Sequence, residues 1–460
     1  MNQRVNDSAS INTDLYQLTM AAGYYSHQLH EQTASFELYV RRMPPNRNFL
    51  IAAGLEQAMD YLNAFQFQAQ ELEFLKQLDV FKHLPVDFFE YLSDLKFTGD
   101  VWALPEGTVF FPYEPIMRIQ APLIQAQLVE TWLLSMVNYQ TNVASKAARI
   151  RLVLNQSRQK ADFLDFGSRR AHGPEASVLA ARAAYIGGAI GTSNVLAAQV
   201  FGLPIYGTAA HAWTMAFDTE PEAFQAYREV FPEHSSLLVD TYDTLQGVKH
   251  AIQSGPNLKA IRLDSGDFLS LSKQSRELLD QAGMNKTQIV VSGDMNEYKI
   301  QDLIAHNAPI DHFGIGTELV TSIDAPSLGG VYKLVEIQHP DGPHYCTKLS
   351  GSKISYPSKK QVWRHYDSAG KIQQDQIGKA EENLDGEALM VQIMKSGQMI
   401  SPPENLKHIQ ARTLSSLQNL PENLLSLNSL EKPFQALISP ALQDLYLKLK
   451  NKNTQEALHV

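Results

Sequence analysis

Short apolar runs that each end in a polar turn recur between Asp162 and Thr321. A continuous apolar run is typical of a buried parallel strand, and stretches of helical periodicity lie between most of these runs. In such folds the carboxyl ends of the strands face one rim, which carries the chemistry. We therefore expect the polar residues after the runs to converge on one pocket. The segments are FLDFGSRRAHG (163–173), PIYGTAAH (204–211), SLLVDTY (236–242), AIRLDSGD (260–267), IVVSGD (289–294) and HFGIGTELVT (312–321).

The sequence on either side of these repeats has other patterns. Helical spacing predicts helices over 15–28, over 54–65 and, as one long helix, over 124–154. Residues 34–42 alternate as a strand does, and 101–122 is rich in β-forming residues and prolines, which favours a small antiparallel layer. After residue 330 the pattern again predicts antiparallel strands joined by turns.

These patterns together predict an α/β protein with three parts. We expect an N-terminal α/β (α+β) domain over 1–125, an α/β core over 126–330, and a C-terminal β/α extension over 331–460. Five or six βα units are fewer than the eight of a regular barrel. The core is therefore either an irregular barrel or an open sheet, and the sequence alone does not decide between them.

Composition and charge exclude several classes of function. The 460 residues carry a formal net charge of −10, which argues against a general nucleic-acid surface. No apolar run of membrane-spanning length and no secretory signal are visible. The single cysteine, Cys346, excludes an intramolecular disulfide and a cysteine-based zinc cluster, and it fits a cytoplasmic location.

Two motifs that follow predicted strands contain candidate functional residues, an arginine pair that could bind an anion and a histidine that could take part in catalysis. Arg169 and Arg170 lie between Gly167 and the sequence HGP, a context that favours a tight loop aimed at a ligand. Arginine holds a carboxylate or a phosphate through a planar fork that lysine cannot copy. His211 follows a Gly-Thr turn that contains Thr208, and a neutral imidazole there can act as a base or as a nucleophile.

The motif RLDSGD (262–267) places two carboxylates three positions apart around a glycine turn. Such a pair can bind ribose hydroxyls, or it can hold Mg²⁺ through water. Asp264 is the candidate of the two because it is nearer the strand end, whereas Asp267 has the position of a helix N-cap. Arg262, Ser265 and Gly266 belong to the same candidate site.

Two glycine loops follow the apolar runs that begin at residues 289 and 312. Glycines let successive backbone amides approach a phosphate. The two loops are Ser292-Gly293-Asp294 and Gly314-Ile315-Gly316-Thr317. The segment TKLSGSK (347–353) is a weaker candidate for additional positive charge. A P-loop motif and a GxSxG motif are absent, so ATP, if it binds, must use another geometry.

Seven motifs in order resemble those of the nicotinate phosphoribosyltransferase family. They are NTDLYQLTMAAGY (12–24), FELYVRRMPPNRNFLIAAGLEQAMDYL (36–62), DFGSRRAHGPEA (165–176), GTSNVLAA (191–198), GTAAHAW (207–213), RLDSGD (262–267) and FGIGTELVTS (313–322). The resemblance spans about residues 12 to 365 and implies an irregular TIM-like α/β barrel with the two flanking parts described above.

The resemblance also implies a reaction and roles for the motif residues. In this family nicotinate is joined to 5-phosphoribosyl 1-diphosphate, which gives nicotinate mononucleotide and diphosphate in the first step of NAD salvage from nicotinate. ATP hydrolysis is coupled through a phosphohistidine, here His211, and Mg²⁺ assists, with Asp264 as a candidate ligand through water. Tyr16 would stack on the pyridine ring from the partner of a homodimer whose active site lies near the interface. Arg169 and Arg170 would hold the nicotinate carboxylate or the diphosphate, RLDSGD the ribose or the metal, and the GIGT amides the 5′-phosphate.

Three alternatives remain open from the residues. The base could be nicotinamide or quinolinate instead of nicotinate. A phosphosugar isomerase or aldolase would need paired acids or a Schiff-base lysine at the strand ends. No lysine lies in 163–171, 207–211, 264–267 or 292–294, which disfavours the aldolase. A non-catalytic sensor of phosphorylated metabolites would bind ligand without releasing diphosphate.

Overall fold

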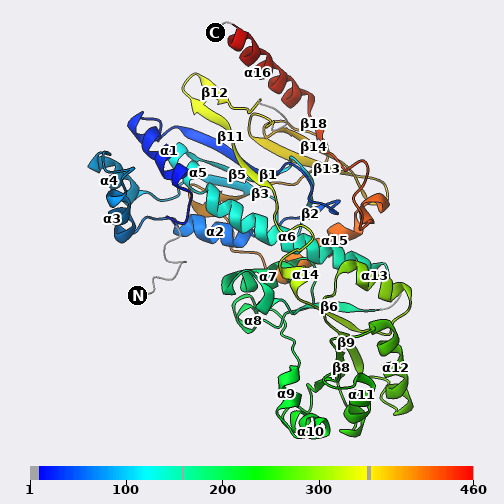
Figure 1. Cartoon of the computed structure of the whole chain (residues 1–460). Helices are drawn as coiled ribbons and strands as arrows, with labels where there is room; N and C mark the ends of the chain where they lie inside the picture. Colours follow the sequence, from blue (N-terminus) through cyan, green and yellow to red (C-terminus); the bar gives the residue numbers. More distant parts are fainter. Residues whose placement is uncertain (1–9, 158–159, 350–353, 459–460) are drawn as a thin grey trace. The chain divides into compact units, whose positions relative to one another are not determined.

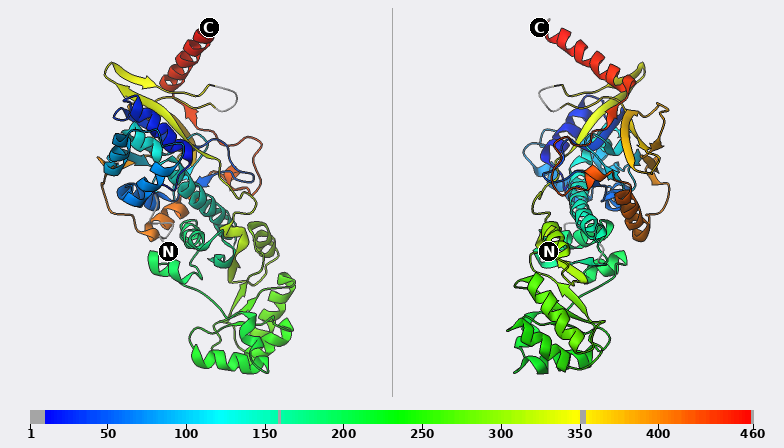
Figure 2. Two further views of the ribbon diagram at one scale, coloured as in Figure 1. Left: turned by 60° about the vertical axis from the view of Figure 1, so that its left-hand side comes forward. Right: turned by 90° about the vertical axis from the view of Figure 1, so that its right-hand side faces the viewer.

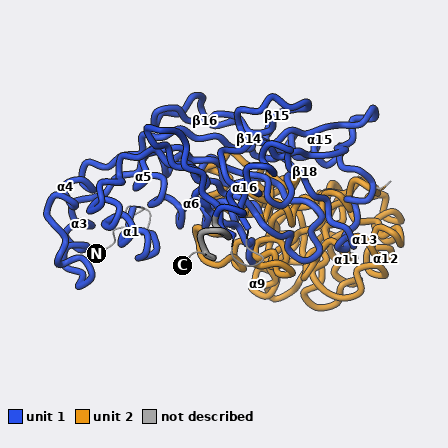
Figure 3. The backbone as a smooth tube through the Cα atoms, turned by 90° about the horizontal axis from the view of Figure 1, so that it is seen from above, with its two compact units in different colours: residues 1–141, 327–460 blue, residues 142–326 orange. Residues whose placement is uncertain are grey.

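The computed structural model describes residues 10–157, 160–349 and 354–458. These residues form two compact units, which Figure 3 shows in different colours. Residues 1–141 and 327–460 belong to unit 1, and residues 142–326 belong to unit 2. The fold is mixed α/β, which confirms the predicted class. The division into domains at 125 and 330 stays a prediction.

Unit 1 is built around a seven-stranded antiparallel sheet of order β12-β11-β1-β5-β3-β16-β17 (Figure 1). Strands from the C-terminal part complete the sheet that the N-terminal part begins, since β1 pairs with β11 on one side and with β5 on the other. A four-stranded sheet, β15-β13-β14-β18, and a short β2-β4 pair complete this unit. Its strands are β1 (Thr33–Val40), β2 (Leu50–Ile51), β3 (Asp100–Ala103), β4 (Val109–Phe110), β5 (Pro115–Pro122), β11 (Gly330–His339), β12 (Gly342–Tyr345), β13 (Lys360–Tyr366), β14 (Ile372–Lys379), β15 (Glu387–Ala388), β16 (Val391–Lys395), β17 (Gln398–Met399) and β18 (Leu437–Ile438).

Helices cover the large sheet of unit 1 and bury its apolar residues. Helix α5 packs on β1 and β5, and α1 packs on α5. Phe36 of β1 stacks on Tyr332 of β11 at 4.9 Å between ring centroids, inside a core of buried aliphatic and aromatic side chains. The helices are α1 (Leu15–Ser26), α2 (Leu55–Ala64), α3 (Ala69–Gln77), α4 (Val86–Asp94), α5 (Leu123–Leu128), the first part of α6 (Glu130–Asn155), α15 (Leu406–Gln418), the 3₁₀ turn η3 (Glu422–Leu425) and α16 (Pro440–Leu458).

The helix predicted over 124–154 is in fact two helices, α5 and α6, separated at Val129. Apolar spacing runs across that break without a proline or glycine, so the periodicity gave no sign of it. Helix α6 continues from unit 1 into unit 2.

Unit 2 contains a five-stranded parallel sheet of order β6-β10-β9-β8-β7, with helices between successive strands as the apolar runs predict (Figures 1 and 2). Helices α11 and α12 pack on β8, and α12 also packs on β9. The elements are β6 (Asp162–Asp165), η2 (Ser168–Arg170), α7 (Pro174–Ile186), α8 (Val195–Phe201), α9 (His211–Met215), α10 (Glu220–Val230), β7 (Ser236–Leu238), α11 (Thr244–Gln253), β8 (Ala260–Leu263), α12 (Phe268–Gln281), β9 (Gln288–Val291), α13 (Glu297–Ala305), β10 (His312–Ile315) and α14 (Thr317–Val320).

Two further segments extend this sheet beyond β6. Thr192 forms a parallel bridge to Asp165, and Ile205 forms a parallel bridge to Thr192. The expected apolar run over 204–211 therefore contributes a single bridge rather than a strand. In the described residues the strand pairs form an open array, and no closed ring of strands is present.

The carboxyl ends of the five strands lie at one edge of the unit 2 sheet. Parallel pairing aligns the last residue of β6 with that of β10, and the last residue of β8 with that of β9. The loops after these strands are the ones that the sequence marks as polar. This edge is therefore where the candidate side chains can meet.

Candidate functional site

His211 stands at the start of α9, near the carboxyl edge of the unit 2 sheet, with 40% of its side chain exposed. Its Nδ1 lies 3.2 Å from Thr241 Oγ1, a hydrogen bond that fixes the plane of the ring. Its Nε2 faces two carboxylates, at 3.8 Å from Asp264 Oδ2 and 4.0 Å from Asp240 Oδ1. These distances are too long for hydrogen bonds, so the imidazole nitrogen that faces the carboxylates is open to a reactant.

Asp240 is the second residue after β7, and its side chain is almost fully buried. Its Oδ2 accepts hydrogen bonds from the Asp264 backbone amide at 2.9 Å and from the Ser265 hydroxyl at 2.7 Å. Its Oδ1 is buried and has no hydrogen-bond donor among the described residues. A buried carboxylate oxygen without a donor is costly unless a cation or a proton meets it.

Arg262 organises the neighbouring side chains of the site. Its Nη2 donates to Asp264 Oδ1 at 2.6 Å, its Nε to Ser292 Oγ at 2.7 Å, and its Nη1 to Thr208 Oγ1 at 2.9 Å. The guanidinium therefore uses all three nitrogens on protein partners that come from three loops. Its main effect is to orient the carboxylate of Asp264.

The electrostatic surroundings of Asp264 favour its ionised form. Burial alone would raise the pKa of this carboxyl, but the hydrogen bond from Ser292 and the charge and hydrogen bond of Arg262 outweigh burial, and nearby His211 adds to their effect. The pKa of Asp264 is consequently below its ordinary value. A carboxylate that stays ionised at neutral pH suits the binding of a metal–diphosphate complex or a ribose hydroxyl.

The arginine pair lies on the 3₁₀ turn after β6, and both side chains are exposed. Among the described residues neither guanidinium has a hydrogen-bond or ion-pair partner. Buried Asp165 anchors the turn, because its Oδ1 accepts from the Gly167 amide at 2.9 Å while its Oδ2 accepts from Thr192 at 2.7 Å. Gly167 is required there, since a Cβ would come within 2.1 Å of Val320.

The two glycine loops differ in what their glycines do. Gly293 has φ +98°, and a Cβ would meet the Asp264 carbonyl oxygen at 2.2 Å, so this glycine lets the loop pass close to the RLDSGD loop. Gly314 lies inside β10, where the missing side chain leaves room for the ring of Phe166. Gly316 and Thr317 form the junction between β10 and α14.

The structure brings six of the predicted site residues into one hydrogen-bonded or close-contact group. They are Thr208, His211, Arg262, Asp264, Ser265 and Ser292. Gly266 continues the Ser265 turn, and Asp267 caps α12 as predicted. Tyr16 lies in unit 1, on α1, with 48% of its surface exposed. Of the TKLSGSK candidate, Ser350, Gly351 and Lys353 lie outside the described residues.

Sequence reasoning missed two residues of this group, Asp240 and Thr241. Asp240 is the second residue after β7, and in the run SLLVDTY it stands where Asp264 stands in AIRLDSGD. The signal was thus present in the pattern of the runs.

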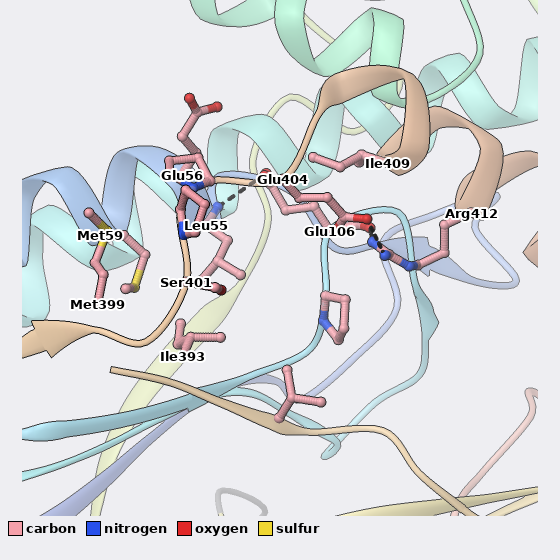
Figure 4. A pocket seen from close by; sticks show the side chains of 14 residues that line it. Leu55, Glu56, Met59, Glu106, Ile393, Met399, Ser401, Glu404, Ile409 and Arg412 are labelled. Atoms are coloured by element: carbon pink, nitrogen blue, oxygen red, sulfur yellow. Dashed lines mark hydrogen bonds and ion pairs between the residues drawn. The ribbon is translucent and has the colours of Figure 1, made fainter. Parts of the chain in front are cut away.

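A separate cavity of about 440 Å³ lies in unit 1 (Figure 4). Figure 4 shows Leu55 and Met59 of α2, Ile393 and Met399, and the ion pair between Arg412 and Glu404 around it. None of the predicted site residues lines this cavity. Its charged lining residues are three glutamates and one arginine, so the wall is net negative and disfavours a ligand that carries phosphates.

Two features are absent from the described residues. No group of three or more histidine, cysteine, aspartate or glutamate side chains has an arrangement that could hold a metal ion. None of the helices has both the length and the apolar composition needed to cross a membrane.

Comparisons with known proteins identify the family of the chain. The model of the nicotinate phosphoribosyltransferase (NAPRTase) N-terminal domain matches residues 11–138, and that of the NAPRTase family matches residues 161–384. The nicotinate phosphoribosyltransferase pncB2 of Mycobacterium tuberculosis is 42% identical over 97% of this chain and 95% of its own length. The nicotinate phosphoribosyltransferase of Bacillus subtilis is 45% identical over 78% of this chain and 74% of its own length.

Solved structures extend the likeness to the whole fold. The crystal structure of human nicotinic acid phosphoribosyltransferase superposes with a TM-score of 0.83 and 29% identity, and the match covers 95% of this chain and 99% of the human chain. A nicotinate-nucleotide pyrophosphorylase from Pyrococcus furiosus shares the fold at a TM-score of 0.74 and 24% identity, over 91% of this chain and 99% of its own. The chain belongs to the nicotinate phosphoribosyltransferase (NAPRTase) family.

Proposed function

We propose that the protein is a nicotinate phosphoribosyltransferase whose active site is the carboxyl edge of the unit 2 sheet. The pyridine nitrogen of nicotinate attacks C1′ of 5-phosphoribosyl 1-diphosphate, the bond from C1′ to the diphosphate oxygen breaks, and nicotinate mononucleotide and diphosphate are released. The observation that carries this proposal is the group formed by His211, Asp240, Asp264 and Arg262, in a chain that belongs to this family.

His211 is the proposed acceptor of a phosphoryl group from ATP. A proton on Nδ1 donated to Thr241 leaves a lone pair on Nε2, which is the nitrogen that has no hydrogen bond. Nε2 attacks the γ-phosphorus, a P–N bond forms, and the bond to the bridging oxygen breaks so that ADP leaves. Water later cleaves the phosphohistidine and releases inorganic phosphate. Because His211 is partly exposed, ATP and water can reach it.

The residues present fit a magnesium–diphosphate complex better than a metal ion held by protein alone. Mg²⁺ commonly takes one or two carboxylates and completes its shell with water and substrate phosphates. Asp240, with a buried oxygen that lacks a donor, and ionised Asp264 are the two proposed carboxylates. When bound, Mg²⁺ would neutralise the charge that develops on the leaving diphosphate. Arg262 keeps Asp264 oriented toward that position.

Arg169 and Arg170 are the proposed binding groups for the nicotinate carboxylate or the diphosphate. Their guanidinium groups are exposed on an anchored turn and have no protein partner among the described residues, so they are available for an anion. Nicotinamide carries a neutral amide and would leave such a group without its charge partner. This argument favours nicotinate as the base.

Unit 2 is proposed to be an irregular TIM-like barrel with one open seam. The parallel segments run in the order Ile205, Thr192, β6, β10, β9, β8, β7, which is the sequential order of a barrel cut between Ile205 and β7. The first strand, β6, pairs with the last, β10, as closure requires. Two contacts span the cut, Thr208 with Arg262 and His211 with Thr241.

We also propose a homodimer in which Tyr16 completes the partner's active site. Two apolar patches are exposed, one on α1 and one on α8, and large exposed apolar patches mark protein interfaces. The α1 patch contains Leu15, Tyr16 and Met20, and the α8 patch contains Val195, Leu196 and Val200.

Mixing the Tyr16→Ala protein with the His211→Ala protein tests the proposed shared active site. Exchanged subunits would recover part of the activity only if each site contains residues of both protomers.

A competition assay tests the proposed reaction and base. Labelled nicotinate is incubated with the phosphoribosyl donor, and nicotinate mononucleotide and diphosphate are measured. We expect one diphosphate for each mononucleotide formed, and weak competition from unlabelled nicotinamide or quinolinate. Binding of the donor without diphosphate release would instead indicate a sensor, and stronger inhibition by nicotinamide than by nicotinate would refute the carboxylate–arginine assignment.

A further inference from the structure

Lys146 is a buried lysine on the part of α6 that belongs to unit 2, and no role follows for it from the reaction above. Only 1% of its side chain is exposed, yet its Nζ contacts three carboxylates. The distances are 2.7 Å to Glu297 Oε2, 3.0 Å to Asp324 Oδ1 and 3.3 Å to Glu318 Oε2. A lysine is almost never fully buried unless it is paired, so this cluster is a specific arrangement.

Two of the three carboxylates come from segments that follow the glycine loops closely, and Asp324 lies after the end of α14. Glu297 begins α13, three residues after the loop Ser292–Asp294, and Glu318 lies in α14, two residues after Gly316. Asn296 connects the two segments, since its side-chain amide donates to Glu318 Oε1 at 3.3 Å. One ammonium group thus fixes the far ends of both loops to the same helix.

Among the described residues, this cluster has fewer cations than carboxylates. Arg149 is the second cation and donates to Glu297 Oε1 at 2.8 Å. Burial would raise the pKa of Glu297, but the charges of Lys146 and Arg149 outweigh burial and hold it below the ordinary value. Two cations therefore face three carboxylates. Glu318 and Asp324 are also the members with partial exposure, at 21% and 20%.

We propose that Lys146 is a positioning residue that makes the glycine loops competent to bind the donor's 5′-phosphate. It holds both loops in place, and it offsets part of the charge of Glu318, which would otherwise repel a dianionic phosphate near Gly316 more strongly. The inference rests on the proposed function, in which the Gly314–Thr317 amides bind that phosphate. It adds a requirement for a cation that does not touch the phosphate itself.

The electrostatic part of this role gives two substitutions opposite effects. Lys146→Met removes the cation and leaves the carboxylates, so the dissociation constant for ribose 5-phosphate should rise by about tenfold or more. Glu318→Gln keeps the size of the side chain and an amide oxygen that can accept a hydrogen bond from Lys146, so the loop keeps its anchor while one negative charge is removed. That constant should therefore fall by about two- to threefold. A role in fold stability alone predicts weaker binding for both variants, because each loses an ion pair.

The test is titration calorimetry of the full-length protein with ribose 5-phosphate, together with steady-state kinetics. Lys146→Arg should stay within about threefold of the natural protein, because it keeps the charge. Lys82→Met, which breaks an exposed ion pair with Asp79, is the matched control and should change nothing. In kinetics, Lys146→Met should raise KM for the phosphoribosyl donor much more than KM for nicotinate.

The outcomes separate this inference from the proposed function. Weaker ribose 5-phosphate binding in Glu318→Gln, or no binding by the natural protein, would overturn the role of Lys146. If Lys146→Met does not fold, the direction of change in Glu318→Gln still decides. Failure of the natural protein to make nicotinate mononucleotide, with the opposite effects on ribose 5-phosphate binding preserved, would reject the proposed reaction and leave the role of Lys146 in place.

Discussion

Two regions of the molecule treat charged side chains differently. In unit 1 the pairs Glu37–Lys360 and Arg364–Asp375 are almost completely buried and in direct contact, at 2.7 Å and 2.6 Å. At the carboxyl edge of unit 2, His211 and Asp264 are partly exposed and stand 3.8 Å apart. In these buried pairs each charged group is in direct contact with a group of opposite charge, and this suits a structural role. Charged side chains that stand farther apart beside solvent leave atoms available to a reactant, and this suits a catalytic role.

The buried cluster of unit 1 also limits its own net charge. Burial and then the Asp375 charge hold the pKa of Glu114 well above its ordinary value, although Arg364 opposes them. The neutral form of Glu114 is therefore favoured beside the Arg364–Asp375 ion pair, which joins β13 to β14.

The largest effect that the comparison predicts is on stability in unit 1. Arg364→Leu leaves the fully buried Asp375 without its cation, and removal of one partner of a buried pair costs about 3–5 kcal/mol of unfolding free energy. Asp264→Asn, at the open edge of unit 2, should cost less than about 1 kcal/mol. Thermal or urea unfolding measures the loss of unfolding free energy in each variant. Similar losses in the two variants would contradict the comparison.

The next largest effect is on ATP coupling. His211→Ala should abolish ATP stimulation of nicotinate mononucleotide formation, a loss of about 100-fold or more in the stimulated rate, while a slow ATP-independent transfer remains. Turnover with and without ATP measures this, and His234→Ala, at an exposed histidine of the same unit, is the control. Equal loss of both activities would mean that His211 only supports the fold.

A smaller effect is expected at the arginine turn. Arg169→Lys or Arg170→Lys keeps the charge but loses the planar fork, so KM for nicotinate or for the donor should rise by about tenfold, or about 1.4 kcal/mol. Arg276→Lys, which alters the ion pair with Asp280 on α12, outside the proposed clamp, serves as the control and should leave both KM values unchanged. The proposed clamp fails if neither arginine variant changes either KM.

The smallest predicted effect is at Tyr16. Tyr16→Ala should cost about 0.5–1.5 kcal/mol of substrate binding through lost ring stacking, whereas Tyr16→Phe keeps the ring and should behave as the natural protein does. Initial rates at low nicotinate concentration measure it. If Tyr16→Ala has the same initial rates as the natural protein, Tyr16 has no role beyond the packing of helix α1.

The sequence predicted the elements of unit 2 well because its signals are local. Each buried strand is a short apolar run, and each polar turn follows directly, so the convergence of Arg262, Asp264 and Ser292 could be expected before any coordinates. Asp240 shows the limit of this reasoning, since the run SLLVDTY was seen but its aspartate was not selected.

Features that depend on distant parts of the chain were not predictable in the same way. Lys146 and Asp324 are 178 positions apart, and no local pattern links them. The same holds for the contact of Thr208 with Arg262, which joins residues 54 positions apart in the chain. No proline or glycine marks the helix break at Val129, so hydrophobic periodicity does not reveal it.

Phosphorylation of His211 tests the central claim most directly. The natural protein and His211→Ala are incubated with ATP labelled in its γ-phosphate, and acid-labile phosphate on the protein is measured. We predict labelling of the natural protein that is lost in the variant and that disappears faster when nicotinate and the donor are added. Equal labelling of both proteins, or no acid-labile label in an enzyme whose turnover ATP stimulates, would contradict an active site centred on His211.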